Sequence, residues 1–435
     1  MRECGPVASI TCDRPASIVL DTYRLPPLSA VRIAFLSLAD ARDVRSWSGT
    51  LSFSKAALQR HVGEVVDLTP APVPTLPLKA LDAASRILRG QKYLWEHEPL
   101  LVRRLGRVFT QRVREAKVDA IFAPAASSVL PYLETDRPII YFSDATFQAA
   151  AQTHRGFQRL TARTAAAADA HERASIAKAR VALFASQWAL DSARRDYGAD
   201  PARSQLLHLG ANLPEPPSAA EAQPRGLPIS SAPRPESDAA RAPHAAPDDS
   251  LRLLFVGVHW EGKGGPIALA ALRELRARGV HATLTVVGCE PPAGTPREGL
   301  TVIPFLDKSK PADRARFAQV WREAQLFVLP TRFEAAGIVF IEAGAYGLPS
   351  LGSDVGGVPS YVQHDQTGLL LPLDADGNAW ADAIQALVAD PARYARYARA
   401  ARARYERELN WDAFGRRMAV FVGDLTGERR RHLPR

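Results

Sequence analysis

Short apolar runs alternate along the chain with longer segments whose apolar residues recur at helical spacing. Continuous apolar strands that alternate with helices predict parallel sheets covered by helices on both faces. Before residue 213 the runs are Val31–Leu38, Glu64–Leu68, Val118–Ala123, Pro138–Ser143, Val181–Ala185 and Gln205–Leu209. After residue 250 they are Leu251–Val258, Thr283–Gly288, Thr301–Leu306, Leu326–Pro330, Pro349–Gly352 and Gly368–Pro372. Helical segments are predicted between them at Gly264–Arg278, Pro311–Glu323 and Trp380–Ala389.

Two such blocks predict an α/β protein with two Rossmann-like, doubly wound domains that face each other across a cleft. We place the first domain at residues 31–212 and the second at residues 251–410. Residues 213–250 are rich in Pro, Ala and Ser and nearly free of large apolar side chains, which indicates a linker. Residues 1–30 lack periodicity and indicate a poorly ordered N-terminal extension.

Composition narrows the class of protein. Hydrophobic residues make up 46% of the 435 positions and charged residues 23%, which excludes a wholly disordered chain. No apolar run reaches the length of a transmembrane helix, and the N-terminus has no secretory signal pattern. The three cysteines are too few and too scattered for a disulfide framework or a zinc site. We therefore expect a cytoplasmic protein, and its net charge of +9 favours anionic partners.

The C-terminal stretch is basic. Residues 411–435 predict a helix followed by a basic tail, and residues 393–435 contain twelve Arg and no Lys against five acidic residues. Two interpretations stay open, a solvated helical face and a peripheral contact with an anionic membrane surface on its inner face. No DNA- or RNA-binding signature accompanies these arginines, so we expect no nucleic-acid partner.

The most informative segment is Leu326–Pro372. A strand ends there in a loop that holds Glu334, and a helix of about two turns follows Gly337. The N-terminus of this helix lies at the carboxyl edge of a parallel sheet, where free amide groups bind phosphate. The expected phosphate-binding amides belong to Gly337, Ile338 and Val339.

Two carboxylates flank this predicted phosphate site. Glu342 lies about one turn into the helix, where it can accept hydrogen bonds from the vicinal hydroxyls of a ribose. Glu334 lies in the preceding loop, where it can meet a polyhydroxylated group beyond the phosphate. Two glutamates on a solvated loop and helix are the alternative interpretation.

Glu334 and Glu342, with seven residues between them, match the E-x7-E signature of the family four retaining glycosyltransferases. The flanks fit in register: Gly337, Glu342-Ala343, Gly347-x-Pro349, Ser353-Asp354-x-Gly356-Gly357-x-Pro359 and Thr367-Gly368. The resemblance is close in the C-terminal half and loose in the N-terminal half. It implies the GT-B fold, a nucleoside diphosphate sugar held mostly by the second domain, Glu342 on the ribose and Glu334 on the donor sugar.

A second segment, Leu254–Gly265, is a strand that ends in a Gly-rich turn opening a helix. Lys263 can place an ammonium group beside a diphosphate, and Gly264 and Gly265 are expected to leave the helix N-terminus unobstructed. Similar turns in the family carry an Arg as well as a Lys. Here Val258 stands at the Arg position, so Lys263 is the cation of this pair that the sequence retains.

Other expected donor contacts come from the end of the run Thr301–Leu306. The backbone of Phe305 and Leu306 and the ring of Phe305 could frame the nucleobase, and packing of Phe305 in the core is the alternative. Trp260 is expected to be a wedge between sheet and helix. Nothing in the sequence separates uridine, guanosine and adenosine donors.

The first domain is expected to receive the acceptor. Trp47-Ser-Gly-Thr50 resembles the first Gly-rich loop of these enzymes, so Gly49 and Thr50 are assigned to an acceptor and phosphate loop. Asp144 follows the run Pro138–Ser143, where the family often places a residue that touches the donor sugar or the acceptor. A helix N-cap is the alternative role for Asp144. Asn212 is expected to be structural.

The resemblance implies a retaining hexosyltransferase in which Glu334, Lys263 and Asp144 are the catalytic candidates. We expect no cofactor and no metal, because neither an Asp-x-Asp motif nor a histidine spacing typical of zinc sites occurs. A glycan or a lipid-linked molecule is the expected acceptor. A GT-B sugar-nucleotide epimerase and a non-catalytic protein that binds glycans or a membrane surface are the alternatives.

Overall fold

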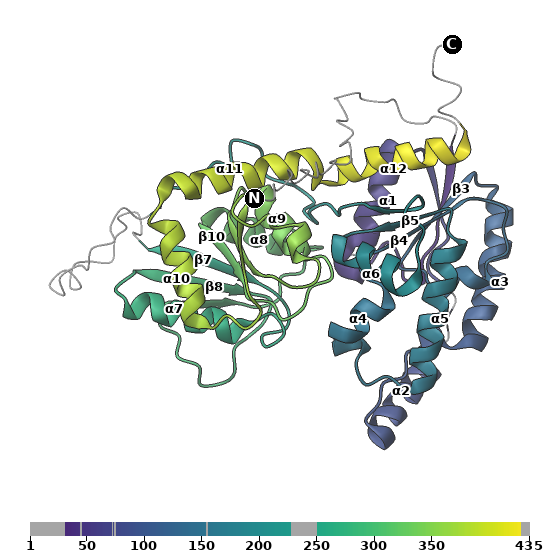
Figure 1. Ribbon diagram of the computed structural model, residues 1–435, viewed down its shortest axis with the longest axis horizontal. Helices are drawn as coiled ribbons and strands as arrows, with labels where there is room; N and C mark the ends of the chain where they lie inside the picture. The colour runs from purple at the N-terminus through teal and green to yellow at the C-terminus, as the bar shows by residue number, and fades with distance from the viewer. Residues whose placement is uncertain are drawn as a thin grey trace, which may run out of the picture.

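The computed structural model describes residues 31–43, 46–71, 73, 75–153, 155–227 and 250–427. These residues form two parallel sheets of six strands each, in the orders β2-β1-β3-β4-β5-β6 and β12-β11-β10-β7-β8-β9. Helices cover both sheets, and the sheets belong to two separate lobes (Figure 1). The predicted extension 1–30 and residues 228–249 of the predicted linker lie outside the described residues.

The first lobe is built around the first sheet. Its strands are β1 (Arg32–Phe35), β2 (Glu64–Asp67), β3 (Ala120–Pro124), β4 (Ile139–Ser143), β5 (Val181–Phe184) and β6 (Ser204–Leu206). Its helices are α1 (Thr50–His61), α2 (Thr75–Arg89), α3 (Pro99–Ala116), α4 (Phe147–Thr153), α5 (Ala162–Lys178) and α6 (Gln187–Tyr197). Short 3-10 turns, η1 (Ser46–Gly49), η2 (Trp95–His97), η3 (Leu130–Tyr132) and η4 (Arg155–Phe157), connect them.

The second lobe repeats the pattern. Its strands are β7 (Leu251–Val256), β8 (Ala282–Val287), β9 (Leu300–Ile303), β10 (Leu326–Leu329), β11 (Ser350–Ser353) and β12 (Gly368–Leu371). Its helices are α7 (Gly265–Ala277), α8 (Pro311–Glu323), α9 (Ile338–Ala345), α10 (Gly377–Val388) and α11 (Pro391–Glu408), with a 3-10 turn η6 (Val358–Ser360). Each of the twelve predicted runs overlaps one strand, so the strand predictions are confirmed.

The last helix, α12 (Trp411–Thr426), returns to the first lobe and packs on α1 and β3. Figure 1 shows α11 and α12 in yellow, running one after the other from the second lobe to the first. Asn410 caps α12 by accepting a hydrogen bond from the amide of Ala413 at 2.8 Å. Phe414 then packs edge-on against Phe122 and Phe142 of the first sheet. The C-terminal helix therefore completes the core of the N-terminal lobe.

Several arginines of the basic C-terminal stretch make internal contacts. Arg404 is 5% exposed, pairs with Glu408 at 2.7 Å and donates to the carbonyls of Ser360 and Tyr361. A solvated face is therefore the wrong description of Arg404. Residues 428–435 of the tail lie outside the described residues, and a membrane contact of the tail stays a hypothesis. No helix in the described part of the chain has the length and apolar content needed to cross a bilayer.

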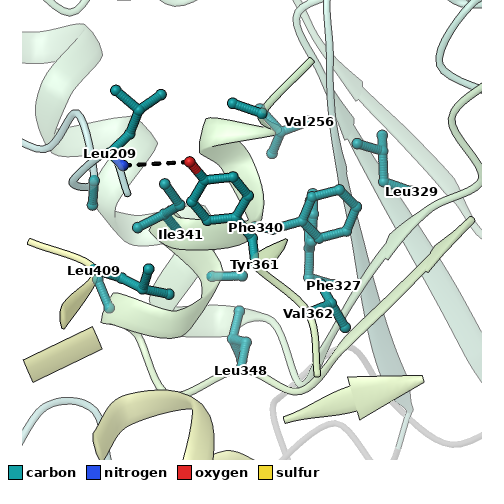
Figure 2. Close-up of a cluster of buried hydrophobic side chains, with 14 of the residues drawn as sticks. Leu209, Val256, Phe327, Leu329, Phe340, Ile341, Leu348, Tyr361, Val362 and Leu409 are labelled. Carbon is teal, nitrogen blue, oxygen red and sulfur yellow. Dashed lines mark hydrogen bonds between the residues drawn. The ribbon is translucent and has the colours of Figure 1, made fainter. Parts of the chain in front are cut away.

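Tyr361, just after η6, ties the two lobes together. Its buried hydroxyl donates to the carbonyl of Ala185 at 2.6 Å and accepts from the amide of Leu209 at 3.3 Å. Figure 2 shows this second bond, with the Tyr361 ring beside Ile341 and Phe340. A further bond runs from the amide of Gln187 to the hydroxyl of Ser360 at 2.9 Å. The lobes are thus joined by directed polar contacts as well as by α12.

Replacing Tyr361 by Phe should lower the free energy of unfolding by about 1–3 kcal/mol, because the buried amide of Leu209 loses its partner. Chemical denaturation of the full chain measures this loss. Tyr405→Phe is the matched control, since Tyr405 is also buried and its hydroxyl has no hydrogen-bond partner among the described residues. Equal stability of the two variants would contradict the assigned role of Tyr361.

Candidate functional site

The turn between β7 and α7 is packed tightly against its own lobe. Trp260 is 8% exposed and lies between Phe255 of the strand, at a ring distance of 6.0 Å, and Gly265 of the helix. A side chain on Gly265 would meet the Trp260 ring at 2.3 Å, and one on Gly264 would meet the Pro330 carbonyl at 1.9 Å. The prediction that Trp260 is a wedge is confirmed.

The same packing corrects the expectation for this helix N-terminus. The amide of Gly264 donates to the carbonyl of Glu261 at 3.1 Å, and the amide of Gly265 donates to the carbonyl of Trp260 at 2.8 Å. The next residue, Pro266, has no amide hydrogen. The expectation that Gly264 and Gly265 offer unobstructed amides to a phosphate is therefore wrong, because the turn uses these groups itself.

The N-terminus of α9 differs in this respect. Gly337 caps it with φ of 80°, a left-handed conformation that favours glycine. The amide of Phe340 bonds back to the carbonyl of Gly337 at 2.9 Å. No acceptor among the described residues engages the amides of Gly337, Ile338 or Val339. Of the two predicted phosphate-binding helix ends, α9 is therefore the one whose donors are available.

Lys263 and Glu334 meet in the structure although 71 positions separate them, and their side chains form an ion pair. Both side chains are largely covered, with 22% and 14% of their surface exposed. The loop of Glu334 is held by the predicted Gly-Gly motif, since the amide of Gly357 donates to the Glu334 carbonyl at 2.9 Å. A side chain on Gly356 would meet that carbonyl at 2.1 Å, so the motif needs glycine for this contact.

Glu342 is 1% exposed and has one satisfied and one unsatisfied oxygen. Its Oε1 accepts from Nζ of Lys308 at 2.6 Å, while Oε2 is buried without a hydrogen-bond partner. Burial raises the pKa of Glu342, and the ammonium group of Lys308 opposes this rise. A buried acceptor without a donor is costly, which is consistent with a ligand hydroxyl completing the site.

The remaining predicted donor contacts lie at the surface. Phe305 is 58% exposed, so the alternative that it packs in the core is wrong, whereas Leu306 packs partly against the core. Val258, at the position where the family carries Arg, is 54% exposed. The exposed ring of Phe305 therefore presents a face on which a nucleobase could stack.

In the first lobe the loop before α1 is strained. Trp47, Ser48 and Gly49 all have positive φ, which is uncommon for the two that are not glycine. The strained loop places Nε1 of Trp47 2.8 Å from Oδ2 of Asp144, to which it donates. Gly49 caps α1, and Oγ1 of Thr50 is buried without a hydrogen-bond partner. The first residue of α1 thus also has an unsatisfied buried oxygen.

Asp144 lies close to Glu334 of the other lobe. Burial raises the pKa of Asp144 to about 6, the hydrogen bond from Trp47 opposes this rise, and the Glu334 charge adds to it. The alternative that Asp144 caps the next helix is wrong. The hydroxyl of Thr146 accepts from the amide of Ala149 at 3.2 Å and takes that role for α4.

Asn212 connects these parts, as a structural residue. It is 1% exposed, its Nδ2 donates to the carbonyl of Ser48 at 2.7 Å, and its Oδ1 accepts from Nε1 of Trp411 at 3.0 Å. The backbone carbonyl of Asn212 accepts from Lys308 at 3.3 Å. The expectation of a structural Asn212 is confirmed.

The structure thus brings together Lys263, Glu334 and Asp144, and it sets Glu342 on the same short helix whose amides are available. Two residues of this site were not singled out from the sequence for these roles, Lys308 and Trp47. Lys308 stands two residues after the predicted nucleobase segment. Its place just after the end of a strand is the sequence signal that identifies it as a candidate site residue. In the sequence Trp47 stands out only as part of a small-residue turn.

The comparisons with known proteins agree with this geometry. Residues 250–390 match the family described as Glycosyl transferases group 1. The D-inositol 3-phosphate glycosyltransferase of Rhodococcus opacus is 31% identical over 217 residues, which is 47% of this chain and 44% of that protein. The glycogen synthase of Mycobacterium tuberculosis is 32% identical over 44% of this chain and 46% of its own length. The chain therefore spans about half the length of the curated relatives it matches.

Solved structures cover nearly the whole chain. Sucrose-phosphate synthase from Thermosynechococcus elongatus superposes with a TM-score of 0.64 at 20% identity, over 92% of this chain and 100% of that one. Anabaena HepE in complex with UDP gives a TM-score of 0.58 at 15% identity, over 91% and 99%. These similarities concern the fold, and the predicted GT-B class with two Rossmann-like domains and a C-terminal helical segment is confirmed.

The raised pKa of Asp144 predicts a pH-dependent stability. Between about pH 4 and 6 the unfolded chain ionises Asp144 while the folded chain keeps its proton, so the folded state loses up to ~3 kcal/mol as pH rises. The stability of the protein relative to an Asp144→Asn variant should fall across this window and then level off. Denaturation curves at several pH values measure the difference.

A second variant tests the proximity of the two carboxylates. Glu334→Gln removes the charge that helps to raise the pKa of Asp144, so the same fall in stability should end at a lower pH. Glu298→Gln is the control, because Glu298 is 81% exposed and pairs with Arg276 on the surface. If both substitutions shifted the pH range of this fall in stability equally, the effect of the Glu334 charge on Asp144 would be contradicted.

Proposed function

Because residues 250–390 carry the Glycosyl transferases group 1 domain, we propose that this chain transfers a hexosyl group from a nucleoside diphosphate sugar to a hydroxyl acceptor, with retention of configuration. One observation carries the proposal. The available amides of α9, the Lys263–Glu334 pair and the unsatisfied Oε2 of Glu342 lie on the loop and helix Glu334–Glu342 and the turn beside it. This is the set of donors and acceptors that a nucleoside diphosphate sugar requires.

Each part of the donor has a matching group. The diphosphate is bound by the α9 amides and by the ammonium group of Lys263, since a helix N-terminus and a cation both attract phosphate. Oε2 of Glu342 accepts hydrogen bonds from the ribose hydroxyls. Glu334 accepts hydrogen bonds from the hydroxyls of the sugar, and Phe305 stacks on the base. Structures of HepE are complexes with UDP and with UDP-glucose, which supports a uridine donor as the first to test.

The reaction breaks the bond between the anomeric carbon and the β-phosphate oxygen and forms a bond from that carbon to the acceptor oxygen. Negative charge develops on the leaving diphosphate, where Lys263 and the α9 amides stabilise it. The acceptor proton passes to a diphosphate oxygen, so no protein base is assigned. We propose that this charge stabilisation by the protein makes a metal unnecessary.

The acceptor enters from the first lobe. The charge of Glu334 on the other lobe acts on Asp144, and the hydrogen bond from Trp47 fixes the position of the Asp144 carboxyl group. The buried hydroxyl of Thr50, at the start of α1, offers a further polar group beside this loop. These groups are placed to orient an acceptor hydroxyl or the donor sugar. A glycan or a lipid-linked molecule is the proposed acceptor class.

The effect of an acceptor on nucleotide release separates the proposed transferase from the alternative functions. A transferase releases nucleotide slowly alone and faster with a suitable hydroxyl acceptor, whereas a sugar-nucleotide epimerase converts the donor without one. A non-catalytic binding protein releases no nucleotide. A thermal-shift series with UDP, GDP and ADP sugars identifies the donor before the acceptor screen.

Glu334→Ala should lower kcat of transfer about 100-fold or more, because the sugar loses the group that orients it. Release of nucleoside diphosphate in the presence of acceptor measures the rate. Glu298→Ala, which removes a glutamate from the same lobe far from the donor groups, should leave the rate unchanged. Transfer by Glu334→Ala at the normal rate would refute the role given to Glu334.

Lys308 and Glu342 should control recognition of the ribose. With Glu342→Gln, or with Lys308→Met that removes its partner, the protein should bind the ribonucleoside diphosphate about tenfold more weakly and lose much of its preference over the 2′-deoxy form. Isothermal titration with both nucleotides measures the preference. Lys310→Met is the control for Lys308, since Lys310 is exposed two residues away. Unchanged preference in the first two variants would exclude Glu342 from the ribose site.

A further inference from the structure

Helix α2 presents its apolar face to solvent. Leu76, Ile87 and Leu88 are 81%, 83% and 80% exposed, and Leu81 is 48% exposed. At 100° per residue these side chains and the alanines between them share one side of the helix. A surface helix normally turns its apolar side to the core and its polar side to water. In α2 this arrangement is reversed.

The opposite side of α2 attaches it to the lobe. Leu78, Asp82 and Ser85 are the partly buried positions of the helix and are spaced by four and three residues. Oδ1 of Asp82 accepts from the amide of Tyr93 at 2.8 Å, and its Oδ2 accepts from Arg86 at 2.7 Å. A polar contact therefore fixes the orientation of the helix and keeps the apolar side outward.

The exposed large apolar side chains are concentrated in one stretch of the sequence, residues 76–100. Leu100, at the start of α3, is also 74% exposed. With the four residues of α2 it accounts for five of the eight exposed large apolar side chains in the described part of the chain. Figure 1 shows α2 at the lower tip of the first lobe, away from the second sheet. A concentration of this kind marks a contact surface.

Charge indicates what the surface contacts. The segment 75–107 contains seven cationic residues and three acidic ones, and the cations are Lys79, Arg86, Arg89, Lys92, Arg103, Arg104 and Arg107. Asp82 and Arg86 pair with each other, which leaves six cations and two acids in the segment. A helix that combines exposed leucine and isoleucine with lysine and arginine fits the boundary between the acyl chains and the headgroups of an anionic bilayer.

We propose that α2, with Leu100 of α3, binds the surface of an anionic membrane. The apolar side of α2 inserts below the headgroups, and the neighbouring cations contact the lipid phosphates. The first lobe, which is the proposed acceptor side, is then held at the membrane. This contact is separate from the basic C-terminal stretch and from the proposed donor site, so it can succeed or fail independently of the transferase activity.

Co-sedimentation of the full chain with vesicles of phosphatidylcholine and phosphatidylglycerol tests the proposal. The triple variant Leu76→Gln, Ile87→Gln, Leu88→Gln should reduce the partition into these vesicles about tenfold or more, because three inserting side chains become polar. Its thermal unfolding should not change, since all three are exposed. Pure phosphatidylcholine vesicles should bind the unsubstituted chain more weakly.

Leu373→Gln is the matched control, because Leu373 is an exposed apolar residue of the second lobe and should leave vesicle binding unchanged. Absence of vesicle binding by the unsubstituted chain overturns the proposal. So does equal binding of the triple variant and the unsubstituted chain. A dimer in light scattering that the triple variant abolishes, without vesicle binding, would instead assign this surface to contacts between copies.

Discussion

The site depends on one buried side chain, the amide of Asn212, where the chain leaves the first lobe. Its Nδ2 donates a hydrogen bond to the carbonyl of Ser48 in the strained loop before α1, and its Oδ1 accepts one from Nε1 of Trp411 in α12. The backbone carbonyl of the same residue accepts from Lys308, which in turn holds Glu342. Because an unsatisfied buried amide is costly, these bonds fix the loop 46–49, the C-terminal helix and the Lys308–Glu342 pair relative to one another.

The fold could be predicted from the sequence because each strand and each helix is determined by residues that are neighbours in the chain. Each strand of a parallel sheet is a short apolar run, and each helix shows its own periodicity, so the twelve strands could be located without knowledge of their neighbours. The carboxylates Glu334 and Glu342 were also visible, since strand, glycine and helix place them on one short segment. The return of α12 to the first lobe could not be read in this way, because it depends on contacts between Phe414 and residues almost three hundred positions earlier.

The site residues that the sequence does not identify depend on partners that are far away in the chain. Lys308 has no pattern of its own, and only the fold shows that it reaches Glu342, 34 positions away. Trp47 likewise becomes a site residue through Asp144, 97 positions away. The prediction that Gly264 and Gly265 offer free amides is wrong for a different reason. A glycine-rich helix start suits a phosphate and also suits close packing, and here the ring of Trp260 and the carbonyl of Pro330 occupy the space that a side chain would need.

In the proposed function, Val258 at the usual arginine position leaves Lys263 and Lys308 as the cations assigned to the donor, and both have carboxylate partners. Lys263 pairs with Glu334, and Lys308 pairs with Glu342. A phosphate that approaches Lys263 competes with Glu334 for the same ammonium group, and Glu334 is then free to accept hydrogen bonds from the sugar beyond the phosphate. Glu342 need not give up Lys308, because its second oxygen is unengaged. In the proposed function, diphosphate binding at Lys263 and sugar binding at Glu334 are therefore coupled, whereas ribose recognition would use the Lys308–Glu342 pair, which is already in place.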